Sequence, residues 1–219
     1  MSKIKNKQND FDIRGNLCYI ENGDLVTEPK YSNCLLIDCK VDKETNGLNE
    51  FSSLIYITCQ MIIFNDYKFN PSIIYFGNPG KEFAHNILIK NYKEIEDIKD
   101  IESINTAPSY FCLDDKQQFA EIVQFIIESR EKTNIDKLQS VFIIIDNAIN
   151  VDLSLLNKFL TKCEKLKIFY IVAIENTNDY KKIGSHFPLR LTFENNKLKR
   201  IIKLIDNEPY LIKEFGINK

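Results

Sequence analysis

The chain has 219 residues, of which 44% are hydrophobic and 27% charged, and this composition is typical of a globular protein large enough for one α/β domain. A formal net charge of −2 excludes the basic footprint that is typical of nucleic-acid-binding proteins. The longest apolar stretch, 51–64, is too short to span a membrane and contains four polar residues. We therefore expect a soluble chain that reaches a membrane only through a larger parent protein.

The cysteines and histidines offer little material for a metal site. The six cysteines are Cys18, Cys34, Cys39, Cys59, Cys112 and Cys163. They form no C-x-x-C pair and most have apolar neighbours, which indicates buried free thiols in a reducing compartment. Because His85 and His186 are far apart in the sequence, we predict neither a histidine-based metal site nor a catalytic triad.

The first half of the chain alternates between predicted strands and helices. Residues 1–10 form a polar lead that we predict to be disordered. An Asn-Gly turn at 22–23 joins two short apolar runs into a hairpin. Buried strands follow at 34–39 and 72–76, and the apolar residues between them recur at helical spacing over 48–64.

A charged segment, 90–102, lies in a less regular region that is predicted to hold a short helix. A short strand over 110–113 follows. A helix then begins at Asp114 and Asp115, because carboxylates stabilise a helix N-terminus. The buried stripe of this helix is predicted to be Phe119, Ile122, Val123, Ile126 and Ile127. Residues 128–139 are expected to be solvated.

The stretch 141–147, Val-Phe-Ile-Ile-Ile-Asp-Asn, is predicted to be the central strand. Its unbroken apolar run is typical of a strand covered on both faces in a parallel sheet. Ligands of such sheets bind beyond the carboxyl ends of the strands, where nucleotide hydrolases keep the aspartate that organises Mg²⁺. Asp146 stands at that end and Asn147 takes the place of the usual second acid. The alternative is that Asp146 only caps the next helix.

The remaining elements complete an α/β pattern. A helix begins at Asp152, strands are predicted over 168–174 and 188–193, and a hairpin over 200–212 closes the chain. This alternation predicts a single domain over 11–219, with a mainly parallel central sheet and helices on both faces.

The loop between Ile37 and Phe51 lacks the phosphate-binding pattern G-x-x-x-x-G-K-[ST]. Its one glycine, Gly47, is followed by leucine, and Lys40 and Lys43 are displaced from the position of the phosphate-binding lysine. Three acidic residues add negative charge where a triphosphate would lie. Weak or absent nucleotide binding is therefore predicted.

Two other features are candidate sites. Residues 77–81, Gly-Asn-Pro-Gly-Lys, are glycine-rich but lack the four-residue gap and the hydroxyl residue, so a tight turn is predicted instead of a phosphate cradle. Glu175 ends the strand 168–174 and is correctly placed for chemistry, although a lone loop acid is more often structural. Asp114 and Asp115 are better explained as helix-capping residues than as a catalytic pair of carboxylates.

The order of these pieces resembles the FtsK/SpoIIIE family of P-loop motor ATPases. Six segments carry the resemblance. Residues 16–38 resemble the family's opening hairpin and first strand, 73–83 its second strand, and 113–130 its long helix. Residues 141–148 resemble its Walker B strand, 168–176 its sensor strand, and 186–193 its Phe-Pro-x-Arg strand. Within the family, Ile-Ile-Ile-Asp-Asn and Leu-Asp-Asp-Lys make the chain most similar to the degenerate C-terminal ATPase module of EssC-type motors of type VII secretion. The resemblance implies a RecA-like P-loop NTPase fold, ATP and Mg²⁺ as cofactors, and a ring oligomer.

Departures from the family pattern imply that the Walker motifs are degenerate. The Walker A residues have no counterparts, the second Walker B acid is Asn147, and the sensor-like pair is replaced by Ile174 and Glu175. Only Asp146 and Arg190 correspond to family residues one by one.

From this combination we expect a module that does not hydrolyse ATP and that works in protein export. It would recognise secreted protein substrates or regulate neighbouring ATPase domains, at the cytoplasmic face of the cell membrane within a larger protein or in the cytoplasm. The alternatives are a weak ATP hydrolase that uses Lys40 or Lys43, and a DNA-translocase accessory, which the acidic balance disfavours.

Overall fold

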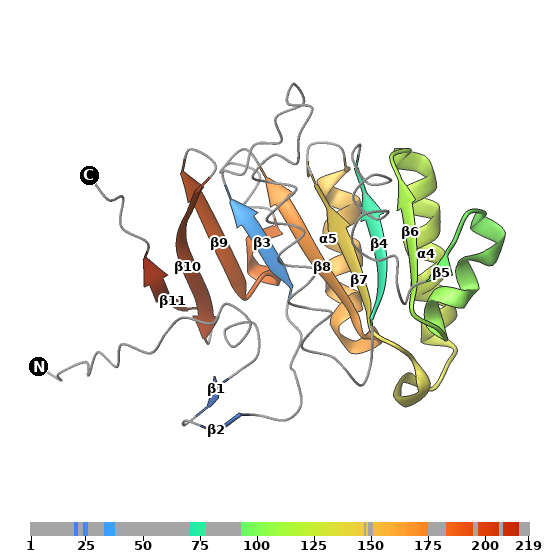
Figure 1. The fold of residues 1–219 in the computed structure, drawn as a ribbon, viewed down its shortest axis with the longest axis horizontal. Coiled ribbons are helices and arrows are strands. Elements are labelled where there is room, and N and C mark those ends of the chain that lie inside the picture. The colour runs from blue at the N-terminus through green and yellow to red at the C-terminus, as the bar shows by residue number, and fades with distance from the viewer. Residues whose placement is uncertain are drawn as a thin grey trace, which may run out of the picture.

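A nine-stranded, mainly parallel sheet forms the centre of the structure (Figure 1). The computed structural model describes residues 20–21, 24–25, 33–37, 71–77, 93–146, 148, 151–174, 183–194, 197–205 and 208–214. The strands of the sheet are β3 (Cys34–Ile37), β4 (Ser72–Phe76), β5 (Lys93–Glu94), β6 (Ser109–Leu113), β7 (Val141–Ile145), β8 (Ile168–Ile174), β9 (Leu189–Glu194), β10 (Lys197–Ile205) and β11 (Glu208–Glu214).

The strand order across the sheet is β11-β10-β9-β3-β8-β7-β4-β6-β5. The seven strands from β9 to β5 pair in parallel, and β10 and β11 continue the sheet as an antiparallel hairpin. The expected mixed α/β fold with a mainly parallel sheet is confirmed. The predicted central strand, β7, lies inside the sheet between β4 and β8, and all five of its residues are buried.

Both hairpins predicted from the sequence are present. Near the N-terminus, β1 (Ile20–Glu21) and β2 (Asp24–Leu25) pair antiparallel, as the predicted hairpin requires. At the other end of the chain, β10 and β11 form the closing hairpin. The predicted helix over 48–64 and the polar lead over 1–10 lie outside the described residues.

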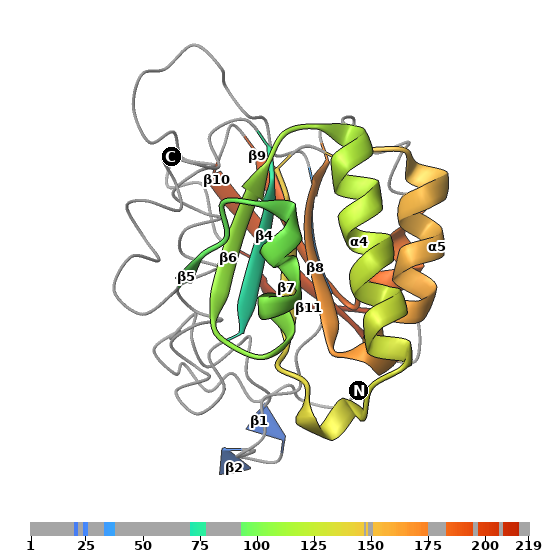
Figure 2. The same ribbon diagram turned by 90° about the vertical axis from the view of Figure 1, so that its right-hand side faces the viewer.

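Two α-helices, α4 (Lys116–Glu131) and α5 (Leu153–Cys163), cover the same face of the sheet (Figure 2). The connections β6-α4-β7 and β7-α5-β8 move along the sheet in the same direction, so right-handed crossovers place both helices on one face. The Asp115 carboxylate caps α4 by accepting a hydrogen bond from the Gln118 N–H at 2.7 Å. The predicted cap and the predicted buried stripe of α4 are both confirmed.

Short 3-10 helices join these elements. They are η1 (Ile98–Asn105), η2 (Ile135–Lys137), η4 (Glu164–Leu166) and η5 (Gly184–His186). The described part of the charged segment predicted over 90–102, residues 93–102, contains β5 and most of η1. Among the described residues, no helix is long and apolar enough to cross a bilayer.

The prediction that residues 128–139 are all solvated is wrong, because Arg130 and Leu138 are buried. Arg130 is 0% exposed and donates hydrogen bonds to Asn105 Oδ1 at 2.8 Å, Leu166 O at 2.7 Å and Gln139 O at 2.6 Å. Burial lowers the pKa of Arg130 to about 10, which leaves the guanidinium protonated at neutral pH. The residue therefore ties the C-terminal turn of α4 to the segments that lead into β7 and β8.

The cysteines that the structure describes are free thiols, as expected, and two of them are buried. Burial raises the pKa of Cys163 to about 12 and also raises the pKa of Cys34. Since the thiolate is the reactive form, neither is expected to react with iodoacetamide at about pH 8 in the folded protein, whereas both should react in urea. Peptide mass spectrometry measures the labelling. Equal labelling rates in the folded and unfolded protein would contradict the structure.

Candidate functional site

Asp146 lies at the carboxyl end of β7, where the sequence predicted it. The N–H of Asp146 donates a hydrogen bond to Phe76 O at 3.1 Å, so the ladder between β4 and β7 continues one residue past the strand. The Phe76 ring packs on Phe119 of α4, with ring centroids 4.5 Å apart. Because side chains alternate along a strand, Tyr75, Gly77 and Asp146 share the opposite face of the sheet.

The Asp146 carboxylate is packed between Tyr75 and Gly77. The Tyr75 hydroxyl donates to Asp146 Oδ2 at 3.4 Å. Gly77 has a φ of 156°, and a Cβ atom at this position would lie only 1.9 Å from Asp146 Oδ2. Glycine is therefore required at position 77 for the carboxylate to occupy its place. Asp146 is only 3% exposed, so its oxygens are almost fully covered.

The covered carboxylate limits what this edge of the sheet does chemically. A catalytic Mg²⁺ ion keeps several waters and binds through one or two carboxylates together with substrate phosphates. Asp146 is of the right type for such a ligand, but its oxygens face the Tyr75 hydroxyl and the backbone of Gly77. Across the described part of the chain, no group of three or more His, Cys, Asp or Glu residues is placed to hold a metal ion.

Arg190, the other residue that matched the family pattern, does not lie near Asp146. It pairs in register with Leu35 of β3, which belongs to the core cluster on the helix-covered face. Three strand spacings, about 14 Å, and the thickness of the sheet separate it from Asp146. Its guanidinium donates to Gly184 O at 2.7 Å and Phe187 O at 3.2 Å, and burial lowers its pKa. In this position Arg190 holds the η5 turn against β9.

Five further candidate residues, and His85, lie outside the described residues. The five are Lys40, Lys43, Gly47, Asn147 and Glu175. His186 is described, and its Nε2 lies 2.9 Å from Asn157 Oδ1 of α5.

Sequence reasoning missed two members of this site. The sequence predicts only a tight turn at Gly77 and places Tyr75 within the predicted strand 72–76. The available signal was that a glycine directly follows one buried strand while an acidic residue directly follows another. Only the register of β4 against β7, which places Phe76 beside Ile145, brings the two together.

Comparison with known proteins identifies the fold. No protein-family profile and no curated protein matches the sequence. Among solved structures, the genome-packaging NTPase B204 of Sulfolobus turreted icosahedral virus 2, in complex with AMPPCP, is similar with a TM-score of 0.54. It is 11% identical, and the match covers 86% of this chain and 100% of that one. The chain has a P-loop NTPase fold.

Two further structures are similar to this P-loop NTPase fold. B204, the DNA-packaging ATPase of Sulfolobus turreted icosahedral virus, is 14% identical over 84% of this chain and 98% of its own, with a TM-score of 0.52. ATPases 2 and 3 of EssC from Geobacillus thermodenitrificans are 13% identical over 74% of this chain, with a TM-score of 0.45. This chain spans 32% of the EssC chain that it matches.

Proposed function

We propose that this P-loop NTPase-fold domain does not hydrolyse nucleotide and serves as a protein-recognition or regulatory module of a protein-export motor. The observation that carries the proposal is the packing of Asp146. A carboxylate that organises Mg²⁺ has to reach the ion and its waters. Here it is 3% exposed, lies against Gly77 and accepts a hydrogen bond from Tyr75.

The amino-acid sequence supports the loss of hydrolysis independently of the packing. The loop that follows β3 has one glycine, Gly47, where the phosphate-binding pattern needs two, and leucine where it needs lysine. Asn147 takes the place of the acid that would polarise the attacking water, and an amide has no basic oxygen at neutral pH. Both changes remove groups that nucleotide hydrolysis needs.

The export setting of the proposal comes from the EssC-type resemblance. In that setting the partners are secreted protein substrates or neighbouring ATPase domains, with which the chain shares a ring. Its place is the cytoplasmic face of the cell membrane, as a part of a larger protein.

The direct test of lost hydrolysis is a titration of the protein with ATP and Mg²⁺ in a calorimeter, together with a phosphate-release assay. We expect no heat of binding up to millimolar ATP, that is, binding weaker than about −4 kcal/mol, and no phosphate release. Asp146→Asn, which keeps the size of the side chain, is expected to behave like the wild type. Micromolar binding, or turnover that Asp146→Asn abolishes, would overturn the proposal.

The second candidate function is weak nucleotide binding. It is favoured by one observation, the match to the whole of a B204 chain whose structure contains the ATP analogue AMPPCP. In this case ATP binds with measurable affinity, and Asp146→Asn weakens the binding. The same titration therefore separates the two candidates.

A further inference from the structure

An open groove of about 460 Å³ is lined by residues of η1 and α4. Helix α4 lies toward the end of the molecule opposite β10 and β11 (Figure 1). Its apolar lining is Ile98, Ile101, Ile122 and Phe125. Its charged lining is Lys99, Glu102 and Glu121. The groove lies on the helix-covered face of the sheet and Asp146 lies on the opposite face, so the groove is separate from the site at the end of β7.

Phe125 is the unusual member of this lining. It lies in the middle of α4 and is 39% exposed, whereas Ile122, one turn earlier on the same helix, is buried. On the other wall, Ile101 of η1 is buried and Ile98 is partly buried. The groove thus has a well-packed apolar floor and one large aromatic ring at its surface, which is the arrangement of an anchor site at a protein interface.

The surface around the groove is strongly acidic. Between Lys93 and Glu131 the sequence has ten acidic and four basic residues, and one of the four, Arg130, is buried. Lys99 of the rim already lies 3.9 Å from the Asp97 carboxylate. The whole chain has a net charge of only −2, so this negative charge is concentrated at one end of the sheet.

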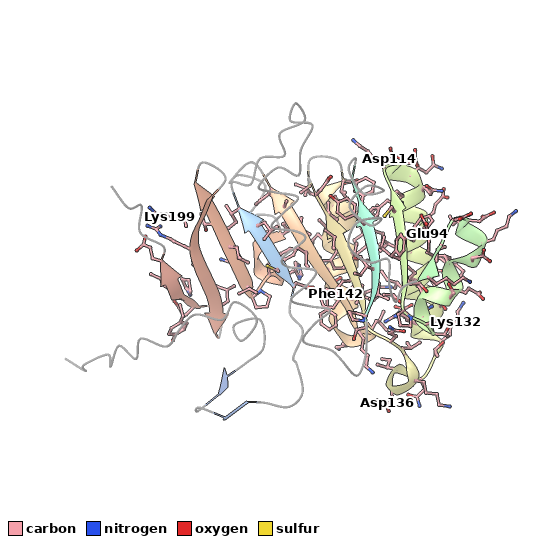
Figure 3. The ribbon with its side chains drawn as sticks, viewed as in Figure 1. Glu94, Asp114, Lys132, Asp136, Phe142 and Lys199 are labelled. Atoms are coloured by element: carbon pink, nitrogen blue, oxygen red, sulfur yellow. The ribbon has the colours of Figure 1, made fainter. Side chains whose placement is uncertain are left out.

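Figure 3 shows Glu94 and Asp114 at the end of the molecule formed by β5, β6 and α4, beside the groove-forming elements. An acidic rim around an apolar groove attracts cations and repels anionic surfaces. The occupant that fits must bring both apolar anchors and positive charge.

We propose that this groove binds a basic amphipathic helix of a partner protein. Apolar side chains spaced i, i+3 or i+4 enter the groove beside Phe125, and Lys or Arg residues flanking them meet Glu102 and Glu121. The proposal deepens the recognition role proposed above and rests on it for its biological setting. An anionic membrane surface is disfavoured, because its headgroups carry the same sign of charge as the rim.

The test begins with selection from a phage-displayed library of random peptides, about 16 residues long so that each spans four helical turns. The wild-type chain is the bait, and peptides that also bind Phe125→Ser are removed. We expect the enriched sequences to carry net positive charge and apolar residues at helical spacing.

The consensus peptide is then synthesised and its affinity measured by fluorescence anisotropy. Phe125→Ser, and the double change Glu102→Lys with Glu121→Lys, should each weaken binding by at least about tenfold. Leu211→Ser is the matched control. Leu211 is also exposed and apolar, at 56%, but lies on β11 at the other end of the sheet, so its loss should leave the affinity within about twofold. Raising NaCl from about 50 to about 500 mM should weaken wild-type binding. Thermal melting confirms that each variant is folded.

Three results would overturn the proposal. The first is enrichment of acidic or non-amphipathic peptides, and the second is that no enriched peptide depends on Phe125 for binding. The third is self-association of the wild type that Phe125→Ser abolishes, because the occupant of the groove would then be a second copy of the chain. The peptide experiment and the ATP titration test separate proposals. ATP turnover would contradict the loss of hydrolysis but would not affect the peptide result. A selection that enriches no peptide would contradict the proposed helix-binding groove but would not affect the nucleotide result.

Discussion

Gly77→Ala is expected to lower the free energy of unfolding by about 2–5 kcal/mol. The added Cβ atom would lie 1.9 Å from Asp146 Oδ2 and 2.0 Å from Asp146 Cγ, so either the carboxylate leaves its place or the ends of β4 and β7 move apart. Overpacking of this kind costs about 1–3 kcal/mol. A side chain at the φ of 156° adds strain of about 1–2 kcal/mol. Urea unfolding followed by circular dichroism measures the loss.

A double-mutant cycle shows whether the Asp146 carboxylate is the cause. Asp146→Ala removes the atoms that the new Cβ would strike, so Gly77→Ala should cost about 1–3 kcal/mol less in that background than in the wild type. The backbone strain at position 77 remains in both backgrounds. Additive costs would show that Gly77 and the carboxylate are not in contact, which would also remove the main support for a covered Asp146.

Arg130→Met is the second change with a large expected effect, a loss of about 3 kcal/mol or more of unfolding free energy. The methionine fills much of the same volume but donates no hydrogen bonds. Leu166 O, Gln139 O and Asn105 Oδ1 then lose their donor inside the protein, and each unsatisfied group costs about 1–3 kcal/mol. A typical domain is stable by only about 5–15 kcal/mol, so this variant should be visibly destabilised in urea.

Arg200→Met is the matched control for this change. The Arg200 Nε also bonds a side chain, Glu214 Oε1, at 2.8 Å, but both side chains are about half exposed. Exposed ion pairs contribute about 0–1 kcal/mol, so Arg200→Met should unfold close to the wild-type urea concentration. Similar stability of the two variants would mean that Arg130 does not form the buried contacts described for it.

The parts of the fold that follow from local sequence patterns were predictable. The unbroken apolar run of β7, the stripe of α4 and the Asp115 cap each depend on residues within a few positions of one another. Arg130 could not be predicted in the same way. Hydrophobic periodicity treats arginine as a solvent-facing residue, and its acceptors come from segments as far as 37 residues away.

The candidate site was predictable only in part for the same reason. The position of Asp146 follows from the end of β7 alone. Its burial depends on Gly77 and Tyr75, which come about 70 residues earlier and meet it only through strand register. Arg190 shows the limit of residue-by-residue correspondence. The sequence pattern located it correctly in β9. Its guanidinium, however, donates to backbone carbonyls at η5, so its role in this structure is to hold that turn.

The position of β3 has a consequence for how the chain folds. Both of its neighbours in the sheet, β8 and β9, come more than 130 residues later in the sequence, since Cys34 pairs with Ile171 and with Leu189. During synthesis, β3 therefore has no strand to pair with until β8 has been translated, when most of the chain has already been synthesised. Pairings of such long range form slowly, because the chain loses loop entropy before it gains contacts. A fragment that ends before β8 has neither neighbour of β3, and it is expected to leave this apolar strand open to aggregation.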